Sequence, residues 1–137
     1  MREAAVSLII KDGLILGISR GKDLTKFGLI GGKLEKGESP VDAAIRETRE
    51  ETGINIVSAI QIYKRVEPAG TPNGEEFNTY CFYADNWNGE PVSSNEGTVK
   101  WLTEKELVET VPAFAEYNIN TLKKFKELFP EVYIKYE

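Results

Sequence analysis

The segment Gly31–Ile54 limits what this chain can fold into more than any other part of the sequence, because it carries both ends of one helix. Ser39 is a favoured N-cap residue, and Pro40 is favoured at the first helical position. Gly53 suits the position just beyond a helix end, where a left-handed backbone is common. The sequence therefore predicts a helix between Ser39 and Gly53, preceded by a pair of glycines.

This helix is expected to have two unlike faces. Glu47 lies beside both Glu50 and Glu51 on a helix surface, and like charges so placed destabilise a helix by a few tenths of a kcal/mol per pair. Such a cluster either faces solvent or has a cation to neutralise it, and oxygen ligands suit Mg²⁺ or Mn²⁺. The centre of the acidic group lies roughly 120° from an apolar stripe suited to core packing. That stripe consists of Val41, Ala44, Ile45 and Thr48.

The spacing of this segment resembles the Nudix box, the signature of hydrolases that cleave nucleoside diphosphates linked to another group. The glycine and Glu38 at their set distances favour this resemblance over a merely solvated acidic face. Thr48 is a mild departure, since the box usually has a hydrophobic residue there. The positions that carry the resemblance are Gly32, Glu38, Arg46, Glu47, Glu50, Glu51, Gly53 and Ile54.

The resemblance implies an α/β fold, a Nudix-type α/β/α sandwich with a mixed β-sheet, and a single domain over residues 1–137. Asp12-Gly13 is a strong hairpin signal, and Thr103 with Glu106 has capping-box spacing for a short helix. The segment 131–137 is expected either to pair as an edge strand or to fray. We expect strands at 4–10, 14–19, 31–34, 55–66, 76–84 and 98–102, a loop at 86–95, and a last helix at 113–129.

Composition excludes several functional classes. The chain has 137 residues, a net charge of −5 and a pI of about 5.0, which argues against binding a nucleic acid polymer. It has no histidine, so a histidine base, a histidine-ligated zinc and a Ser-His-Asp triad are excluded. The one cysteine, Cys81, cannot form an internal disulfide and is expected to be a small buried hydrophobe. No apolar run suits a membrane span and no signal peptide is evident, so we expect a cytoplasmic monomer or homodimer.

The resemblance also implies a metal cofactor, Mg²⁺ with Mn²⁺ as a substitute. Its expected ligands are Glu47, Glu50 and Glu51, with help from Glu38 and from the backbone of Gly32. Arg46 would orient a glutamate rather than touch substrate. The general base is left open between a box glutamate such as Glu50 and Glu96, an acid on a later loop that is equally suited to be a solvated residue.

Several residues outside the box are placed for substrate. Arg20 and Lys33 are suited to an oligophosphate, although such charges often serve only solubility. Phe27 and Phe77 are suited to stack a base, although aromatic residues in strands more often belong to the core. Ile30 replaces a proline common in the family, which is expected to leave the loop before Gly31 less rigid. The best base-reading candidate is Asn118, with Phe114 and Glu116 as alternates.

These expectations combine into one predicted reaction, the Mg²⁺-dependent hydrolysis of a nucleoside triphosphate to the monophosphate and pyrophosphate. The small size favours a MutT-like enzyme acting on a normal, oxidised or otherwise non-standard nucleotide. Hydrolysis of ADP-ribose, a nucleoside diphosphate sugar or a dinucleoside polyphosphate is the enzymatic alternative. A non-catalytic nucleotide-binding Nudix module and an acidic-helix interaction domain are the alternatives from other classes.

Overall fold

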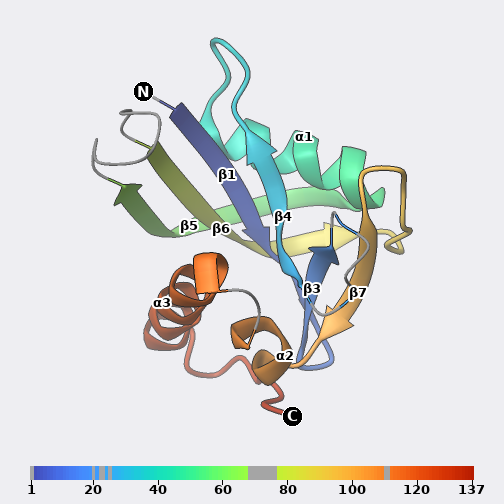
Figure 1. Cartoon of the computed structure of the whole chain (residues 1–137), viewed down its shortest axis with the longest axis vertical. Helices are drawn as coiled ribbons and strands as arrows, with labels where there is room; N and C mark the ends of the chain where they lie inside the picture. Colours follow the sequence, from blue (N-terminus) through green and yellow to red (C-terminus); the bar gives the residue numbers. More distant parts are fainter. Residues whose placement is uncertain (1, 20, 22–23, 25, 68–76, 110–111) are drawn as a thin grey trace.

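A computed structural model describes residues 2–19, 21, 24, 26–67, 77–109 and 112–137 of the chain. It shows a mixed β-sheet with helices on both faces, which confirms the predicted α/β/α sandwich (Figure 1). The strands are β1 (Arg2–Leu8), β2 (Ile10–Lys11), β3 (Leu14–Ser19), β4 (Gly28–Lys33), β5 (Asn55–Glu67), β6 (Phe77–Asn88) and β7 (Thr98–Leu102). The helices are α1 (Pro40–Thr52), α2 (Glu104–Val108) and α3 (Pro112–Leu128).

The strand order explains how distant parts of the chain meet. The sheet runs β2-β3-β4-β1-β6-β5, with β7 paired to β3. β1 pairs in parallel with β6 and antiparallel with β4, so β1 lies in the middle of the sheet. The predicted hairpin is present between β2 and β3, where Asp12 and Gly13 have positive φ values of 53° and 80°. This pairing places the end of β4 beside β1 and next to α1.

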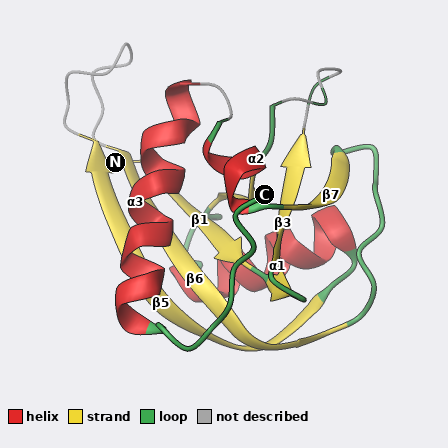
Figure 2. Ribbon diagram, turned by 90° about the horizontal axis from the view of Figure 1, so that it is seen from below, coloured by secondary structure: helices red, strands yellow, loops and turns green. Residues whose placement is uncertain are grey.

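The two long helices cover opposite faces of the sheet (Figure 2). On one face, Ala43 and Ala44 of α1 pack on Phe82 of β6. On the other face, Leu122 and Phe125 of α3 belong to a core cluster that also contains the fully buried Cys81. Because alternate residues of β6 meet different helices, this strand is buried on both sides. Within the described residues, no helix is long and apolar enough to cross a membrane.

The caps of α1 follow the predicted chemistry. The hydroxyl of Ser39 accepts a hydrogen bond of 3.2 Å from the N–H of Asp42, and Pro40 begins the helix. Gly53 ends it with φ 82°, donating its N–H to the carbonyl of Arg49. The apolar stripe faces the core as expected. Thr48, the departure from the box, is fully buried and donates to the Ser7 hydroxyl at 3.0 Å, so its polar group is satisfied inside the fold.

The predicted strand 4–10 is divided at Ile9 into β1, which begins at Arg2, and β2. Two other strands extend at least three residues beyond their predicted bounds. β4 begins at Gly28 rather than at Gly31, because residues 28–30 pair with β3 and β1. Ile30 is therefore fully buried and pairs with Ser7, which corrects the expectation of a less rigid loop there. β6 continues to Asn88 instead of giving way to a loop at 86, because pairing with β5 extends to Asn55.

The C-terminal segment adopts neither of its two predicted forms. Residues 131–137 have no strand pairing, yet backbone hydrogen bonds of Lys135 and Tyr136 anchor them to the fold. Lys135 donates to the carbonyl of Gly13 at 2.8 Å, while the carbonyls of Lys135 and Tyr136 accept from Glu104 and Lys105. These two acceptors satisfy amides at the first turn of α2, which lack partners within that helix. α2 itself begins with the predicted capping box of Thr103 and Glu106.

Candidate active site

The glycine pair at the end of β4 lies against the last turns of α1. The carboxylate of Glu51 is 2% exposed and accepts a hydrogen bond of 2.8 Å from the N–H of Gly31. A side chain at Gly31 would overlap the carbonyl oxygen of Ala5 and the backbone of Val6 on β1. Gly31 therefore lets β4 approach β1 closely while its amide remains available to the helix.

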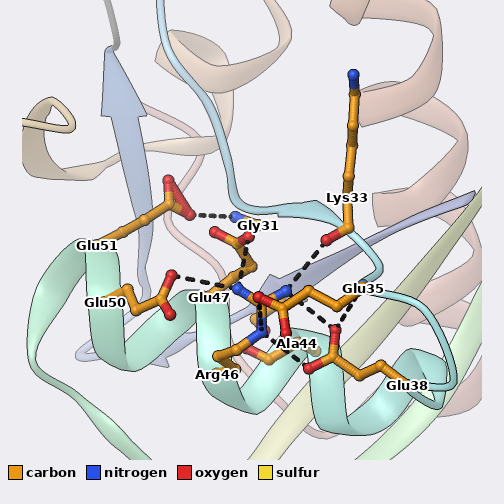
Figure 3. Close-up of polar contacts among 10 residues, drawn as sticks. Gly31, Lys33, Glu35, Glu38, Ala44, Arg46, Glu47, Glu50 and Glu51 are labelled. Atoms are coloured by element: carbon orange, nitrogen blue, oxygen red, sulfur yellow. Dashed lines mark hydrogen bonds and ion pairs between the residues drawn. The ribbon is translucent and has the colours of Figure 1, made fainter.

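The second glycine makes room for another glutamate. A Cβ atom built on Gly32 would lie 2.7 Å from the carboxyl carbon of Glu47. Glu47 is mostly buried, with 16% of its side chain exposed. The carboxylates of Glu47 and Glu51 thus both face the glycine strand from α1, as Figure 3 shows. The resemblance to the Nudix box implies this proximity of the glycine backbone and the acidic helix face.

Arg46 connects most of the acidic group (Figure 3). Its guanidinium donates to both oxygens of Glu38, at 2.8 and 3.0 Å. It also donates to Glu47 at 3.0 Å and to Glu50 at 3.2 Å. A further bond of 3.1 Å reaches the carbonyl of Lys33. The guanidinium of Arg46 therefore links the loop before α1, the helix itself and β4.

The charges of this network shift the pKa values of Glu38 and Arg46. Hydrogen bonds from Arg46 and from the Glu35 amide lower the pKa of Glu38 to about 2. The same pairing with Glu38, followed by that with Glu47, raises the pKa of Arg46 above its ordinary value. Both groups are therefore charged at neutral pH. Arg46 offsets the repulsion among the neighbouring glutamates, which explains how the helix tolerates them.

Carboxylate and backbone oxygens of this kind suit a hard divalent cation. Within the described residues, no three acidic, histidine or cysteine side chains already form a metal-binding group. Arg46 engages Glu38, Glu47 and Glu50 instead. The oxygen atoms present suit a divalent metal, while the glutamate side chains are arranged around Arg46. The expected ligand set therefore remains a prediction.

The loop before β7 is bound to the end of α1. Val92 donates its N–H to the carbonyl of Thr52 at 2.9 Å. The hydroxyl of Ser94 donates to the carbonyl of Glu51 at 3.4 Å and accepts from the N–H of Glu96 at 3.1 Å. Glu96 is exposed on this loop. Ser94 is not predictable as a site residue from the sequence, because its only local signal is its place in a run of turn-forming residues.

The remaining predicted substrate residues are placed differently. Lys33 is exposed at the end of β4, and its ammonium extends away from the glutamates (Figure 3). Phe27 is 4% exposed and packs in the core cluster beneath α3. Asn118 is 2% exposed and donates to the carbonyl of Leu107 at 3.3 Å. In this conformation neither Phe27 nor Asn118 presents a free surface to a base, so their roles in base binding stay predictions.

Other predicted residues contribute less. Glu116, an alternate for base reading, is exposed and forms an ion pair of 3.4 Å with Arg65. Arg20 and the side chains of Phe77 and Phe114 lie outside the described residues. The site that the structure does bring together therefore consists of the box residues, the two glycines and the loop that carries Glu96.

Comparison with known proteins agrees with this geometry. The model of the NUDIX domain family matches residues 1–125. The chain is 40% identical over 74 residues to the Nudix hydrolase YvcI of Bacillus subtilis, covering 52% of this chain and 47% of that protein. It is 34% identical over 97 residues to the oxidized purine nucleoside triphosphate hydrolase of Danio rerio, covering 69% and 61% respectively. The chain thus spans about half to three fifths of the length of these relatives.

The fold is also shared with a solved structure. The crystal structure of the MutT NUDIX hydrolase from Burkholderia pseudomallei matches with a TM-score of 0.73 and 25% identity, over 88% of this chain and 97% of that one. The family match extends over most of the sequence and includes every box residue described above. The chain therefore belongs to the Nudix family.

Proposed function

We propose that this chain is a Mg²⁺-dependent pyrophosphohydrolase that cleaves a nucleoside triphosphate to the monophosphate and pyrophosphate. The observation that carries the proposal is the convergence of Glu47 and Glu51 on the Gly31–Gly32 backbone, with Arg46 connecting Glu47 to Glu50. A pure nucleotide-binding module has no need for the complete acidic set. The Danio rerio relative and a Mus musculus protein that is 31% identical over 90 residues are both oxidized purine nucleoside triphosphate hydrolases, which favours a purine triphosphate as substrate.

The residues divide the work by position. Glu47, Glu50 and Glu51 would hold the divalent ion, assisted by Glu38 and by the backbone of Gly32. When bound, such an ion neutralises phosphate charge and makes a coordinated water easier to deprotonate. Arg46 holds Glu47 and Glu50 in place through its hydrogen bonds.

The proton of the attacking water goes to a carboxylate, since the chain has no histidine. Glu50 and Glu96 are the two residues proposed for this step. Glu50 is half-exposed beside Arg46, and Glu96 is exposed on the loop that contacts the end of α1. Lys33 and Arg20 are proposed to bind the phosphate chain.

One screen tests the reaction and the substrate together. The purified protein is incubated with nucleoside triphosphates, their oxidised forms, ADP-ribose, nucleoside diphosphate sugars and dinucleoside polyphosphates, with Mg²⁺, with Mn²⁺ and with a chelator. We expect monophosphate and pyrophosphate from a purine triphosphate, with no product in the chelator. Cleavage of a diphosphate conjugate alone would replace the proposed substrate class. Binding without product would instead support a non-catalytic module.

A further inference from the structure

The segment Val92–Gly97 forms a cap on the end of α1. The last four carbonyls of a helix have no partner within it. Besides the usual bond from Gly53 to Arg49, this segment supplies two donors from outside the helix, the N–H of Val92 to Thr52 and the hydroxyl of Ser94 to Glu51. The capped turn is the one that carries the Glu50 and Glu51 side chains. The loop is therefore connected to the site through the backbone carbonyls of Thr52 and Glu51. A sequence motif defined by side chains does not reveal these contacts.

Within this segment, residues 94–97 form a tight turn. Ser94 and Gly97 exchange two backbone hydrogen bonds of 3.1 Å each. Gly97 packs closely against the end of β3, since a Cβ atom on it would come within 2.6 Å of the Ser19 carbonyl oxygen. The turn is thus fixed on one side by β3 and on the other by α1. Glu96 lies on it between these two anchors.

The hydroxyl of Ser94 joins the turn that carries Glu96 to the end of α1. It accepts from the N–H of Glu96 and donates to the carbonyl of Glu51, so one oxygen bridges the loop acid and the metal-box helix. We propose that Ser94 is a positioning residue that holds Glu96 against the catalytic turn of α1. This inference rests on the proposed function, in which Glu96 is one of the two residues proposed to accept the proton of the attacking water.

The chain provides a matched control one residue away. The hydroxyl of Ser93 also accepts a backbone hydrogen bond in this loop, from the N–H of Val99 at 3.1 Å. That contact leads to β7 and not to α1. Ser93→Ala therefore removes the same group from the same loop without breaking the bridge. Ser94→Thr keeps a hydroxyl at the bridging position.

Kinetics give the first test. We expect Ser94→Ala to lower kcat for the triphosphate by about tenfold while KM changes less than about threefold, because the acid loses its position and the binding groups do not. Ser93→Ala is expected to retain normal turnover, and Ser94→Thr to restore most of kcat. In a Glu96→Gln background, Ser94→Ala should cause less than about a twofold further loss, since the two residues act together. Equal losses in both backgrounds, or for both serines, would overturn the proposal.

Amide hydrogen exchange gives a second test that needs neither metal nor turnover. In the metal-free protein we expect Ser94→Ala to speed exchange of the Glu96 amide by about tenfold or more, because its acceptor is removed. Ser93→Ala should leave that amide unchanged and instead speed exchange at Val99. An unchanged Glu96 amide in Ser94→Ala would show that the bridge does not form. An unsubstituted protein without activity would contradict the proposed function, whereas this exchange result would still decide on the bridge.

Discussion

The carboxylate of Glu51 and the N–H of Gly31 are joined by a hydrogen bond of 2.8 Å that connects the last turn of α1 to the end of β4. The two residues are 20 positions apart in sequence, and the glutamate is almost fully buried. A buried carboxylate needs such partners, since its desolvation is costly. The contact joins the acidic helix and the glycine strand into one structural unit. Substitutions can test the role of each residue in it.

The two glycines are expected to fail in different ways. Gly31→Ala would force the new methyl group into the backbone of Ala5 and Val6, and we expect a loss of about 2 kcal/mol or more in the free energy of unfolding. At Gly32→Ala, the three atoms nearest to the new methyl group all belong to the end of the Glu47 side chain, which can move. This substitution should cost less than about 1 kcal/mol but lower turnover by about tenfold or more. Denaturant unfolding and pyrophosphate release measure both, and a reversed order would contradict this assignment.

Glu50 is expected to matter for turnover and not for folding. Its side chain is 48% exposed, so Glu50→Gln should change the free energy of unfolding by less than about 0.5 kcal/mol. Loss of its charge should lower kcat by about 100-fold or more. Glu90→Gln is the matched control, because that glutamate is 82% exposed and pairs only distantly with Lys11, at 3.8 Å. Near-normal turnover of Glu50→Gln would remove this residue from the mechanism.

The Glu38–Arg46 pair predicts a dependence of stability on pH. The pKa of Glu38 is about 2 in the folded chain, against an ordinary value of 4.5, because Arg46 and the Glu35 amide donate hydrogen bonds to its charged form. The unfolded chain therefore binds more protons as the pH falls between these values, and the stability that the pair contributes is lost over that window. It is fully present above pH 4.5.

Unfolding in denaturant at several pH values checks this expectation. Glu38→Gln should flatten the acid decline relative to the unsubstituted protein. Glu35→Gln is the control, since its side chain is 69% exposed and lies 3.8 Å from the same guanidinium. An identical acid decline in all three proteins would show that Glu38 does not cause it.

Asn118 can be tested for structure against substrate binding. Its buried amide donates to the Leu107 carbonyl and connects α3 to α2. Asn118→Ala leaves that carbonyl without its partner, and we expect a loss of about 1–3 kcal/mol in the free energy of unfolding. Asn120, two positions further along α3, is half-buried. Its replacement by alanine should lower the free energy of unfolding by less. If Asn118 instead reads the base, its replacement will raise KM and leave stability unchanged.

Local signals in the sequence were sufficient for the elements that depend on neighbouring residues. The caps of α1, the Asp12-Gly13 hairpin and the capping box of α2 all involve residues a few positions apart, and all are present. The family signature likewise placed the acidic helix and the mixed sheet. Element ends were less accurate, because β4 and β6 extend as far as their partners pair with them, which no local pattern specifies.

What the sequence by itself determined is the set of box residues, the helix that displays them and the exclusion of histidine chemistry. Tertiary structure alone decided which partner each side chain has. It buried Phe27 and Asn118 and brought Ser94 to the end of α1. It also gave the buried hydroxyl of Thr48 a hydrogen-bond partner in Ser7. The physical reason is that burial and hydrogen bonding depend on groups far apart in the chain, whereas propensity and spacing report only on neighbours.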